Sequence, residues 1–463
     1  MLTARSHFAR WIGLPLKSLW KREATMRITE ELERAQWLDP EQMRALQERR
    51  LRSLLVEVGQ NVPFYREQIR GLGADPRGDD PWQILTRLPT IDKKSYRSLG
   101  DALRSESARR GPTLAYTSGT TGERLAVRID PDAAAYRYLA GFRGRRWWGI
   151  EQGDPEFKIW GSGIQTATGP GELAYKLVRR AKDWAVGVTL VSPFFREEKD
   201  LEAAVQLLMK TRPKLVFGYA NSIHILAAYM VRAGLRAGPG WPRVVGYTAE
   251  MLMDWQREDI ASAFGAPLAA EYGSCEAGVM AFQCPHGSLH TCDDVVAVEL
   301  LPTDGGDPAA SDRGEVVVTN LMATAYPLIR YRQGDLARRA TTPCACGRGF
   351  GSLQELTGRM NDRFASASGG IVDFIVFDQA MKEQPAIRCF KVVERSVGDL
   401  LFLAELHRGQ EWKPADQARL VRQCRALLPA DAELSVRVCD RLPPEPSGKF
   451  RIMIPAKDAA RYL

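Results

Sequence analysis

The sequence predicts an α/β protein: a large N-terminal domain of parallel and mixed sheets with flanking helices, followed by a small α+β domain. Its 463 residues exceed what one hydrophobic core usually organises, so at least two domains are expected. Between residues 214 and 276, short apolar segments alternate with helical ones, which is typical of a parallel sheet covered by helices. About a hundred C-terminal residues instead carry three strand-like segments and one amphipathic helix.

The chain is predicted to be mostly helical from residue 27 to residue 72. Apolar side chains recur at helical spacing, for example at Met43, Leu46 and Leu51, and the proline-containing stretch 61–66 interrupts the pattern. Two short apolar segments, 114–116 and 125–127, are then expected to pair as a hairpin around a loop.

A helix over residues 133–148 follows the hairpin. It carries three arginines near its end: Arg143, Arg145 and Arg146. These arginines could meet phosphates, but a solvated face is the favoured interpretation because most charge clusters are solvated.

The alternating stretch, residues 214–276, predicts three strands with a helix after each of the first two. The strands are 215–217, 243–247 and 267–271; the first helix is capped by Asn221 or Ser222, and the second spans 254–264. Ligands of parallel sheets bind beyond the carboxyl ends of the strands. Tyr219, Glu250 and the segment 272–276 follow strand ends, so they are predicted to line a binding site.

Composition restricts the partners of the chain. The formal charge of +8 suits anionic small molecules, and no basic run with interleaved aromatic residues indicates nucleic acid. No apolar run approaches the roughly 18 residues of a membrane span. Residues 1–22 are basic and amphipathic, and packing against the body is favoured over contact with a membrane surface. Eight cysteines without an export signal indicate a reducing cytoplasm.

The loop of the predicted hairpin holds four hydroxyl residues and two glycines. Its residues are Thr117, Ser118, Gly119, Thr120, Thr121 and Gly122. Glycine lets the backbone approach a ligand, and hydroxyls donate to phosphate oxygens. The loop is no Walker motif, because Glu123 and Arg124 stand where that motif has lysine and a hydroxyl residue. Taken alone, an ordinary solvated turn explains the loop equally well.

Four further motifs follow the loop. They are Tyr272-Gly273-Ser274-Cys275-Glu276, Tyr331-Arg332-Gln333-Gly334-Asp335, Gly358-Arg359-Met360-Asn361-Asp362 and Ser447-Gly448-Lys449. In this order, the five motifs resemble the signature set of adenylate-forming enzymes, which include acyl-CoA synthetases, luciferases and peptide-synthetase adenylation domains. The phrase Asn61-Val62-Pro63-Phe64-Tyr65-Arg66, followed by Leu88-Pro89-Thr90-Ile91-Asp92-Lys93, resembles the start of the phenylacetate–CoA ligase-like branch.

The resemblance implies an acyl-CoA synthetase-like architecture and activity. Residues 1–358 would bind ATP and the acid, residues 359–363 would form a hinge, and residues 364–463 would form a mobile lid. A carboxylic acid, aryl or related, would react with ATP and Mg²⁺ to give an acyl-adenylate and pyrophosphate, and coenzyme A would take the acyl group. Two alternatives stay open: transfer to an amine in polysaccharide or natural-product biosynthesis, and a relative that binds nucleotide without turnover.

The resemblance also assigns roles to single residues. Tyr272 would lie along the adenine, Glu276 would ligate Mg²⁺, and Asp335 would accept from both ribose hydroxyls. Arg359 would lie near ribose and phosphate, and Lys449 would bring charge to the α-phosphoryl group. The expected catalytic residues are therefore Lys449, Glu276 and Arg359. The expected nucleotide-binding residues are the 117–122 loop, Glu250, Tyr272, Gly273 and Asp335.

Three positions depart from the family pattern. Cys275 stands where a serine or threonine usually precedes the glutamate, Leu125 where many members have a lysine, and Asn361 where a hinge aspartate is common. The carboxylates and the lysine that carry the reaction are present. The departures therefore affect rate and pocket detail more than the kind of reaction.

A second group of residues has the chemistry of a metal site. Cys284, His290, Cys344 and Cys346 are predicted to hold a structural Zn²⁺, with His286 and Cys292 as substitutes. The alternative is a set of reduced thiols without metal, because the spacing is not that of paired zinc knuckles.

Overall fold

The computed structural model describes residues 22–116, 125–131, 133–161, 172–193, 195, 197–302, 312–359, 364–368, 371–372, 374–381, 384–407, 409–442 and 451–463. The predicted phosphate loop, the predicted hinge after Arg359, Lys449 and the segment 1–21 lie outside them. The chain divides into two compact units: residues up to Met251 with Asp259–Leu356, and Leu252–Glu258 with Thr357–Leu463. The predicted domain limits and hinge stay predictions.

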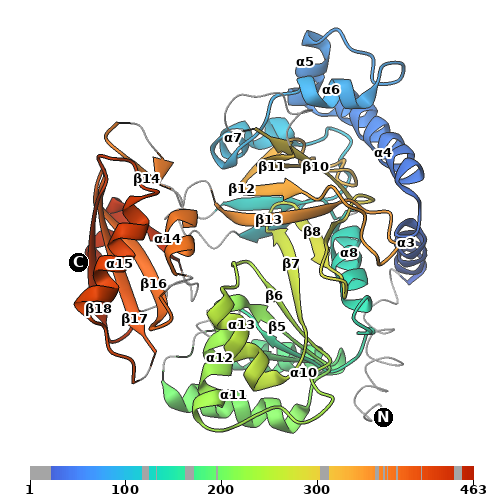
Figure 1. Ribbon diagram of the computed structural model, residues 1–463. Helices are drawn as coiled ribbons and strands as arrows, with labels where there is room; N and C mark the ends of the chain where they lie inside the picture. Colours follow the sequence, from blue (N-terminus) through green and yellow to red (C-terminus); the bar gives the residue numbers. More distant parts are fainter. Residues whose placement is uncertain are drawn as a thin grey trace. The chain divides into compact units, whose positions relative to one another are not determined.

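An 11-stranded mixed sheet runs through the larger unit (Figure 1). Its strand order is β10-β11-β12-β13-β9-β8-β7-β6-β5-β3-β4. The strands are β3 (Glu156–Ile159), β4 (Val188–Val191), β5 (Leu215–Tyr219), β6 (Val244–Thr248), β7 (Leu268–Ser274), β8 (Gly278–Gln283), β9 (Leu289–Thr291), β10 (Val296–Leu301), β11 (Arg313–Asn320), β12 (Tyr331–Arg339) and β13 (Ser352–Arg359). Strands β3 to β7 pair in parallel, and β7 to β9 and β10 to β12 pair antiparallel, so the α/β class is confirmed.

Helices flank this sheet. They are α3 (Arg22–Ala35), α4 (Pro40–Asn61), α5 (Pro63–Gly71), α6 (Pro81–Arg87), α7 (Lys93–Leu99), α8 (Ala134–Arg146), α10 (Glu172–Ala185), α11 (Glu198–Thr211), α12 (Ala220–Arg232) and α13 (Asp254–Phe264), with a 3₁₀ turn at Gly100–Leu103. Asp39 and Gln42 form a capping box that starts α4. Leu51, Leu54 and Val58 of α4 are buried in one core with Val316 of β11. No helix among the described residues is long and apolar enough to cross a membrane.

Two local predictions have different outcomes. The hairpin is confirmed, because β1 (Thr113–Tyr116) and β2 (Ala126–Ile129) pair antiparallel with Tyr116 opposite Ala126. The cap predicted at Asn221 or Ser222 is wrong: α12 already begins at Ala220, and both residues are buried within it. The Asn221 amide instead donates to Glu250, so a tertiary contact satisfies this helix N-terminus.

The carboxyl ends of the parallel strands β5, β6 and β7 lie at the same edge of the large sheet. Tyr219 of β5 lies opposite Thr248 of β6, and Thr248 lies opposite Glu271 of β7. Tyr219, Glu250 and Tyr272 therefore lie at the carboxyl ends of neighbouring parallel strands, as predicted. Helix α12 packs on β5 and β6, while α8 packs beside β8 (Figure 1).

The smaller unit is an α+β unit, as predicted. Its four-stranded sheet has the order β18-β17-β16-β19. Its elements are β14 (Phe364–Ala365), β15 (Ile371–Val372), α14 (Phe374–Met381), β16 (Ile387–Ser396), β17 (Asp399–Leu406), α15 (Pro414–Arg425), β18 (Glu433–Cys439), β19 (Met453–Ile454) and a 3₁₀ turn at Ala456–Arg461. Leu420 and Cys424 of α15 are buried, as the apolar face of an amphipathic helix requires. Leu427, which follows the end of α15 at Arg425, is 55% exposed.

Candidate functional site

Two predicted nucleotide-binding residues, 63 positions apart in sequence, meet at the strand ends. The Tyr272 hydroxyl donates to Asp335 Oδ2 over 2.8 Å. Tyr272 ends the buried part of β7, and Asp335 lies on β12 after the positive-φ residue Gly334. The pair places an aromatic ring beside a carboxylate that can accept hydrogen bonds from a sugar.

Glu276, the predicted magnesium ligand, lies in the turn between β7 and β8. The Tyr331 hydroxyl donates to Glu276 Oε1 over 3.1 Å. Tyr331 is buried, and the ring of Tyr96 stands edge-on to it at 6.2 Å. Because the Tyr331 ring is packed in the core, its hydroxyl holds the Glu276 carboxylate in one orientation.

Arg137 of α8 fixes the backbone of the same turn. Its guanidinium donates to the carbonyl of Glu276 over 2.6 Å and to that of Cys275 over 2.8 Å. Gly278 has φ +86°, and a Cβ there would lie 3.1 Å from Arg137 Cγ, so glycine permits this approach. Burial lowers the pKa of Arg137 from its usual value. No sequence motif indicates a role for Arg137 or for the Tyr331 hydroxyl, because only folding brings them to this turn.

Glu250 and Gly273 have structural tasks at the site. Glu250 Oε2 accepts from the Asn221 amide over 2.9 Å and so serves the N-terminus of α12. The preceding Ala249 has φ +69°, a region that side chains rarely adopt. A Cβ on Gly273 would lie 2.7 Å from the Gly278 carbonyl oxygen, so close pairing of β7 and β8 requires glycine here. Nucleotide contacts by both residues stay predictions.

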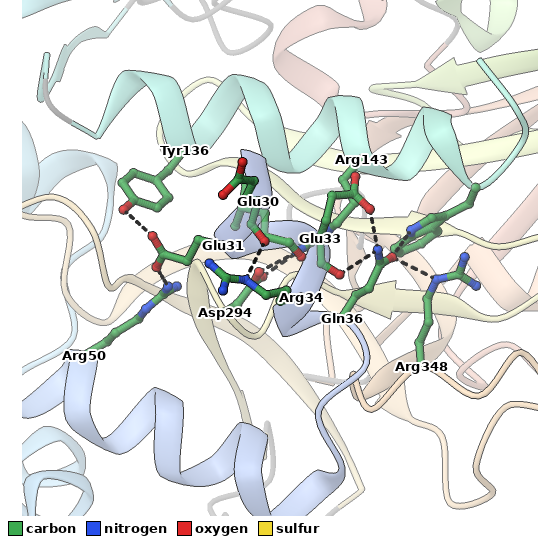
Figure 2. A network of polar contacts seen from close by, with 12 residues as sticks. Glu30, Glu31, Glu33, Arg34, Gln36, Arg50, Tyr136, Arg143, Asp294 and Arg348 are labelled. Carbon is green, nitrogen blue, oxygen red and sulfur yellow. Dashed lines mark hydrogen bonds and ion pairs between the residues drawn. The ribbon is translucent and has the colours of Figure 1, made fainter. Parts of the chain in front are cut away.

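The three arginines near the end of α8 pair with carboxylates. Arg143 forms an ion pair with Asp294, and both side chains are buried. Arg145 Nη1 lies 3.1 Å from Glu156 Oε2, and Arg146 contacts Glu33 at 2.9 Å. Figure 2 shows Arg143, Asp294 and Glu33 where α8 meets α3. The solvated-face interpretation is therefore wrong for Arg143, and all three guanidiniums are already held by protein carboxylates.

Other predicted site residues lie in the hairpin loop, at the end of β13 and near the C-terminus. The loop 117–122, Lys449 and Asn361 lie outside the described residues. Strand β13 ends at Arg359, and only the backbone of Arg359 is described. Leu125, at the position of the family lysine, is 3% exposed and belongs to the core. The roles of the loop, Arg359 and Lys449 stay predictions.

The four predicted metal ligands come together. One ligand atom from each of Cys284, His290, Cys344 and Cys346 lies within 4.8 Å of the others. The sulfurs of Cys284 and Cys344 are 3.7 Å apart, and His290 Nε2 is 3.1 Å from the sulfur of Cys346. Two sulfurs about 2.3 Å from a tetrahedral zinc would be about 3.8 Å apart, so the donor set and its spacing fit that ion.

The surroundings of this cluster also suit metal binding. The Phe350 carbonyl lies 3.3 Å from His290 Nδ1, which can donate to it and leave Nε2 available as a ligand. Two further residues were predicted as substitutes, His286 and Cys292, and neither belongs to the cluster. Cys292 is buried beside Arg143, and burial raises its pKa to about 12.

Comparisons with known proteins agree with this fold. No protein-family model matches the sequence. The phenylacetate–coenzyme A ligase of Thermus thermophilus is 28% identical over 343 residues, 70% of this chain and 72% of that protein. Protein CapK of Staphylococcus aureus is 21% identical over 452 residues, 96% of this chain and 95% of that protein.

Solved structures share the fold over most of the chain. A 2-hydroxyisobutyryl-CoA ligase in its postadenylation state has a TM-score of 0.71 at 17% identity, covering 93% of both chains. An anthranilate–CoA ligase has a TM-score of 0.50 at 16% identity, covering 84% of this chain and 74% of its own. The fold is that of adenylate-forming acyl-CoA ligases. In sequence, the chain is similar to the Thermus phenylacetate–coenzyme A ligase.

Proposed function

We propose that the protein activates a carboxylic acid with ATP and transfers the acyl group to coenzyme A. The acid carboxylate would attack the α-phosphorus, pyrophosphate would leave, and the coenzyme A thiolate would displace AMP from the acyl-adenylate. The observation that carries the proposal is the meeting of Tyr272 with Asp335 and of Tyr331 with Glu276 at the strand ends. This arrangement supplies a ring for a base, a carboxylate for a ribose and a carboxylate for a cation.

Each residue of the proposed site would contact a different part of the nucleotide or its metal ion. Tyr272 and Gly273 would border the adenine, Asp335 would accept from the ribose, and Glu276 would help to hold Mg²⁺, which neutralises phosphate charge when bound. Glu250 would border the nucleotide beside α12. The remaining roles belong to the phosphate loop at Thr117–Gly122, to Arg359 and to Lys449, as the family resemblance implies. We also propose that residues 359–363 form the hinge of a lid over 364–463.

Pyrophosphate release across a panel of aryl, aliphatic and hydroxy acids tests the function, with and without coenzyme A. We expect release with at least one acid and a thioester product when coenzyme A is present. If an added amine consumes the adenylate and no thioester forms, the acyl acceptor is an amine and not coenzyme A. Nucleotide binding without pyrophosphate release from any acid would overturn the enzymatic proposal.

We further propose that Cys284, His290, Cys344 and Cys346 hold one structural Zn²⁺. The distances between their ligand atoms support it, and all four coordination positions would be filled by protein. Such a site has no position for a reacting water, so the role of the ion would be structural. Because its ligands come from both segments, it would tie the loop after β8 to the turn before β13. Metal analysis tests this proposal.

A further inference from the structure

Four charged side chains gather on the sheet face that α8 covers. They are Arg145, Glu156, Lys158 and Glu271. Helix α8 comes unusually close to the sheet here, because a Cβ on Gly144 would lie 2.2 Å from the Phe282 ring and one on Gly141 would lie 3.7 Å from Glu271 Oε2. Glu156 and Lys158 alternate with the buried Phe157 and Ile159 of β3, and Lys158 lies opposite Phe217.

The four charges are not equally satisfied. Arg145 pairs with Glu156 over 3.1 Å and stacks over the Phe217 ring at 4.3 Å. Lys158 Nζ faces the rings of Trp160 at 5.1 Å and Phe217 at 5.5 Å. In the described part of the chain, neither Lys158 nor Glu271 forms a hydrogen bond or an ion pair. Both side chains are partly buried, and burial raises the pKa of Glu271 and lowers that of Lys158.

Aromatic side chains complete this group toward the strand ends. Trp160 stacks on Tyr219 with ring centroids 4.5 Å apart. Tyr219, Thr248 and Glu271 form one row across β5, β6 and β7. The next residue of β7 is Tyr272, whose hydroxyl contacts Asp335. The unpaired charges therefore lie one residue along β7 from the proposed nucleotide site, on the face of the strand opposite to the Tyr272 side chain.

We propose that Lys158 and Glu271 select the acid: an aryl acid that carries a hydrogen-bonding substituent, a hydroxyl or an amino group. This inference rests on the proposed function. Trp160 and Tyr219 stack on one another and extend an aromatic surface that a flat ring could join. Glu271 accepts from an O–H or N–H group, and Lys158 donates to an oxygen. A pure hydrocarbon acid would leave both charges desolvated and unpaired, which is costly.

The competing explanation is structural. Two cations and two anions balance one another, so the group could only neutralise itself between α8 and the sheet. The two explanations differ in what mutation does. A structural group affects all acids alike, whereas a selecting group changes the ratio between substituted and unsubstituted acids.

The experiment uses the full chain and matched acids: benzoic and phenylacetic acid, each unsubstituted, hydroxy-substituted and amino-substituted. Pyrophosphate release gives kcat and KM, and calorimetric titration gives acid binding without turnover. We expect the parent to favour a substituted acid by about tenfold or more in kcat/KM. Glu271→Gln and Lys158→Met should remove this preference, because KM for the substituted acid should rise toward the value for the unsubstituted acid. Glu151→Gln and Lys182→Met, at exposed positions, are the matched controls.

Three results would overturn the inference. One is a parent that shows no preference for substituted acids. Another is an unchanged acid ratio in both variants, and a third is an equal loss for all acids together with a lower melting temperature. If Glu271→Gln does not fold, the acid preference of the parent protein and the loss of that preference in Lys158→Met still test the inference. If no acid releases pyrophosphate, the proposed function fails, and the calorimetric preference still tests the acid site by itself.

Discussion

Arg137 is the residue through which α8 acts on the proposed magnesium site. It binds two successive carbonyls, of Cys275 and Glu276, whereas the Glu276 carboxylate is held by Tyr331. A guanidinium makes two parallel contacts from one plane, which an ammonium group cannot do. Arg137 is therefore a positioning residue: it fixes the backbone from which the carboxylate projects.

Arg137→Lys should raise the Mg²⁺ concentration needed for half-maximal pyrophosphate release about tenfold, since a lost charge-assisted hydrogen bond costs about 1.5–3 kcal/mol. The rate at saturating Mg²⁺ should fall less. Calorimetric titration with Mg²⁺ and ATP should show the same weakening without turnover. Arg146→Lys on the same helix is the control, because Arg146 pairs with Glu33 away from the turn. An unchanged magnesium dependence would remove Arg137 from this role.

Cys275 fills the place of a family hydroxyl and is not expected to be a nucleophile. Burial is the largest cause that raises its pKa, and the neighbouring Glu276 adds to the shift, so the thiol stays protonated near neutral pH. Cys275→Thr should keep or raise turnover. Mass spectrometry of the protein during turnover provides the check: a covalent acyl adduct on Cys275, together with loss of activity in the variant, would contradict this prediction.

At the scale of elements, α8 is the frame on which several parts of the larger unit are assembled. Arg143 pairs with Asp294 and also donates to the Leu32 carbonyl over 3.0 Å, so one buried guanidinium ties α8 to α3 and to the segment before β10 (Figure 2). Trp147, just after α8, stands edge-on to the cluster residue His290 at 5.8 Å and donates to Gln36 over 2.7 Å. The proposed zinc cluster and the N-terminal helices therefore share the end of α8.

Asp294→Asn should destabilise the protein strongly, by about 3–5 kcal/mol, because the Arg143 charge would stay buried without its counter-charge. Thermal unfolding measures this effect. Glu33→Gln is the matched control, since it weakens the partly exposed pair with Arg146, and exposed pairs contribute about 0–1 kcal/mol. Equal melting temperatures for the two variants would show that the buried pair is not a major source of stability.

Protein purified without chelator should contain about one zinc per chain, the stoichiometry of a single closed site. Because metal binding is folding energy for the two loops, Cys344→Ser should lower the melting temperature by about 5 °C or more, and it should reduce turnover of the folded fraction less. Cys439→Ser, outside the cluster, is the control. Absence of zinc from every preparation, with a Cys344→Ser variant that melts like the parent, would leave these cysteines as ordinary thiols.

At the scale of the whole molecule, the proposed chemistry is divided between two units. Glu276, Tyr272 and Asp335 belong to the larger unit, whereas Lys449, which lies outside the described residues, is predicted to act from the lid segment 364–463. Lys449→Ala should slow acyl-adenylate formation about a hundredfold or more, the usual effect of removing one electrostatic contact to a transition state. Thioester formation from a synthetic acyl-adenylate should change much less. Equal losses in the two half-reactions would make the lysine structural.

The sequence alone determined the α/β class, the β1–β2 hairpin and the clustering of Cys284, His290, Cys344 and Cys346. The first two predictions succeeded because they rest on local information, namely apolar periodicity and turn residues. The third rests on the chemistry of the side chains, because three thiols and one imidazole suit a single zinc ion. The motif order also predicted the fold that the chain shares with solved acyl-CoA ligase structures. It predicts Glu276 and Asp335 as site residues, although it did not show which side chains hold them.

Only the tertiary structure decided the partners. Helical periodicity marks Arg137, Arg143 and Arg145 alike as arginines of one helix, yet the first binds carbonyls of the β7–β8 turn and the other two bind Asp294 and Glu156. The cap of α12 comes from Glu250, 29 residues away. Contacts of this kind depend on which strands become neighbours in the sheet. They are set by the packing of distant segments, and no local spacing of the sequence encodes them.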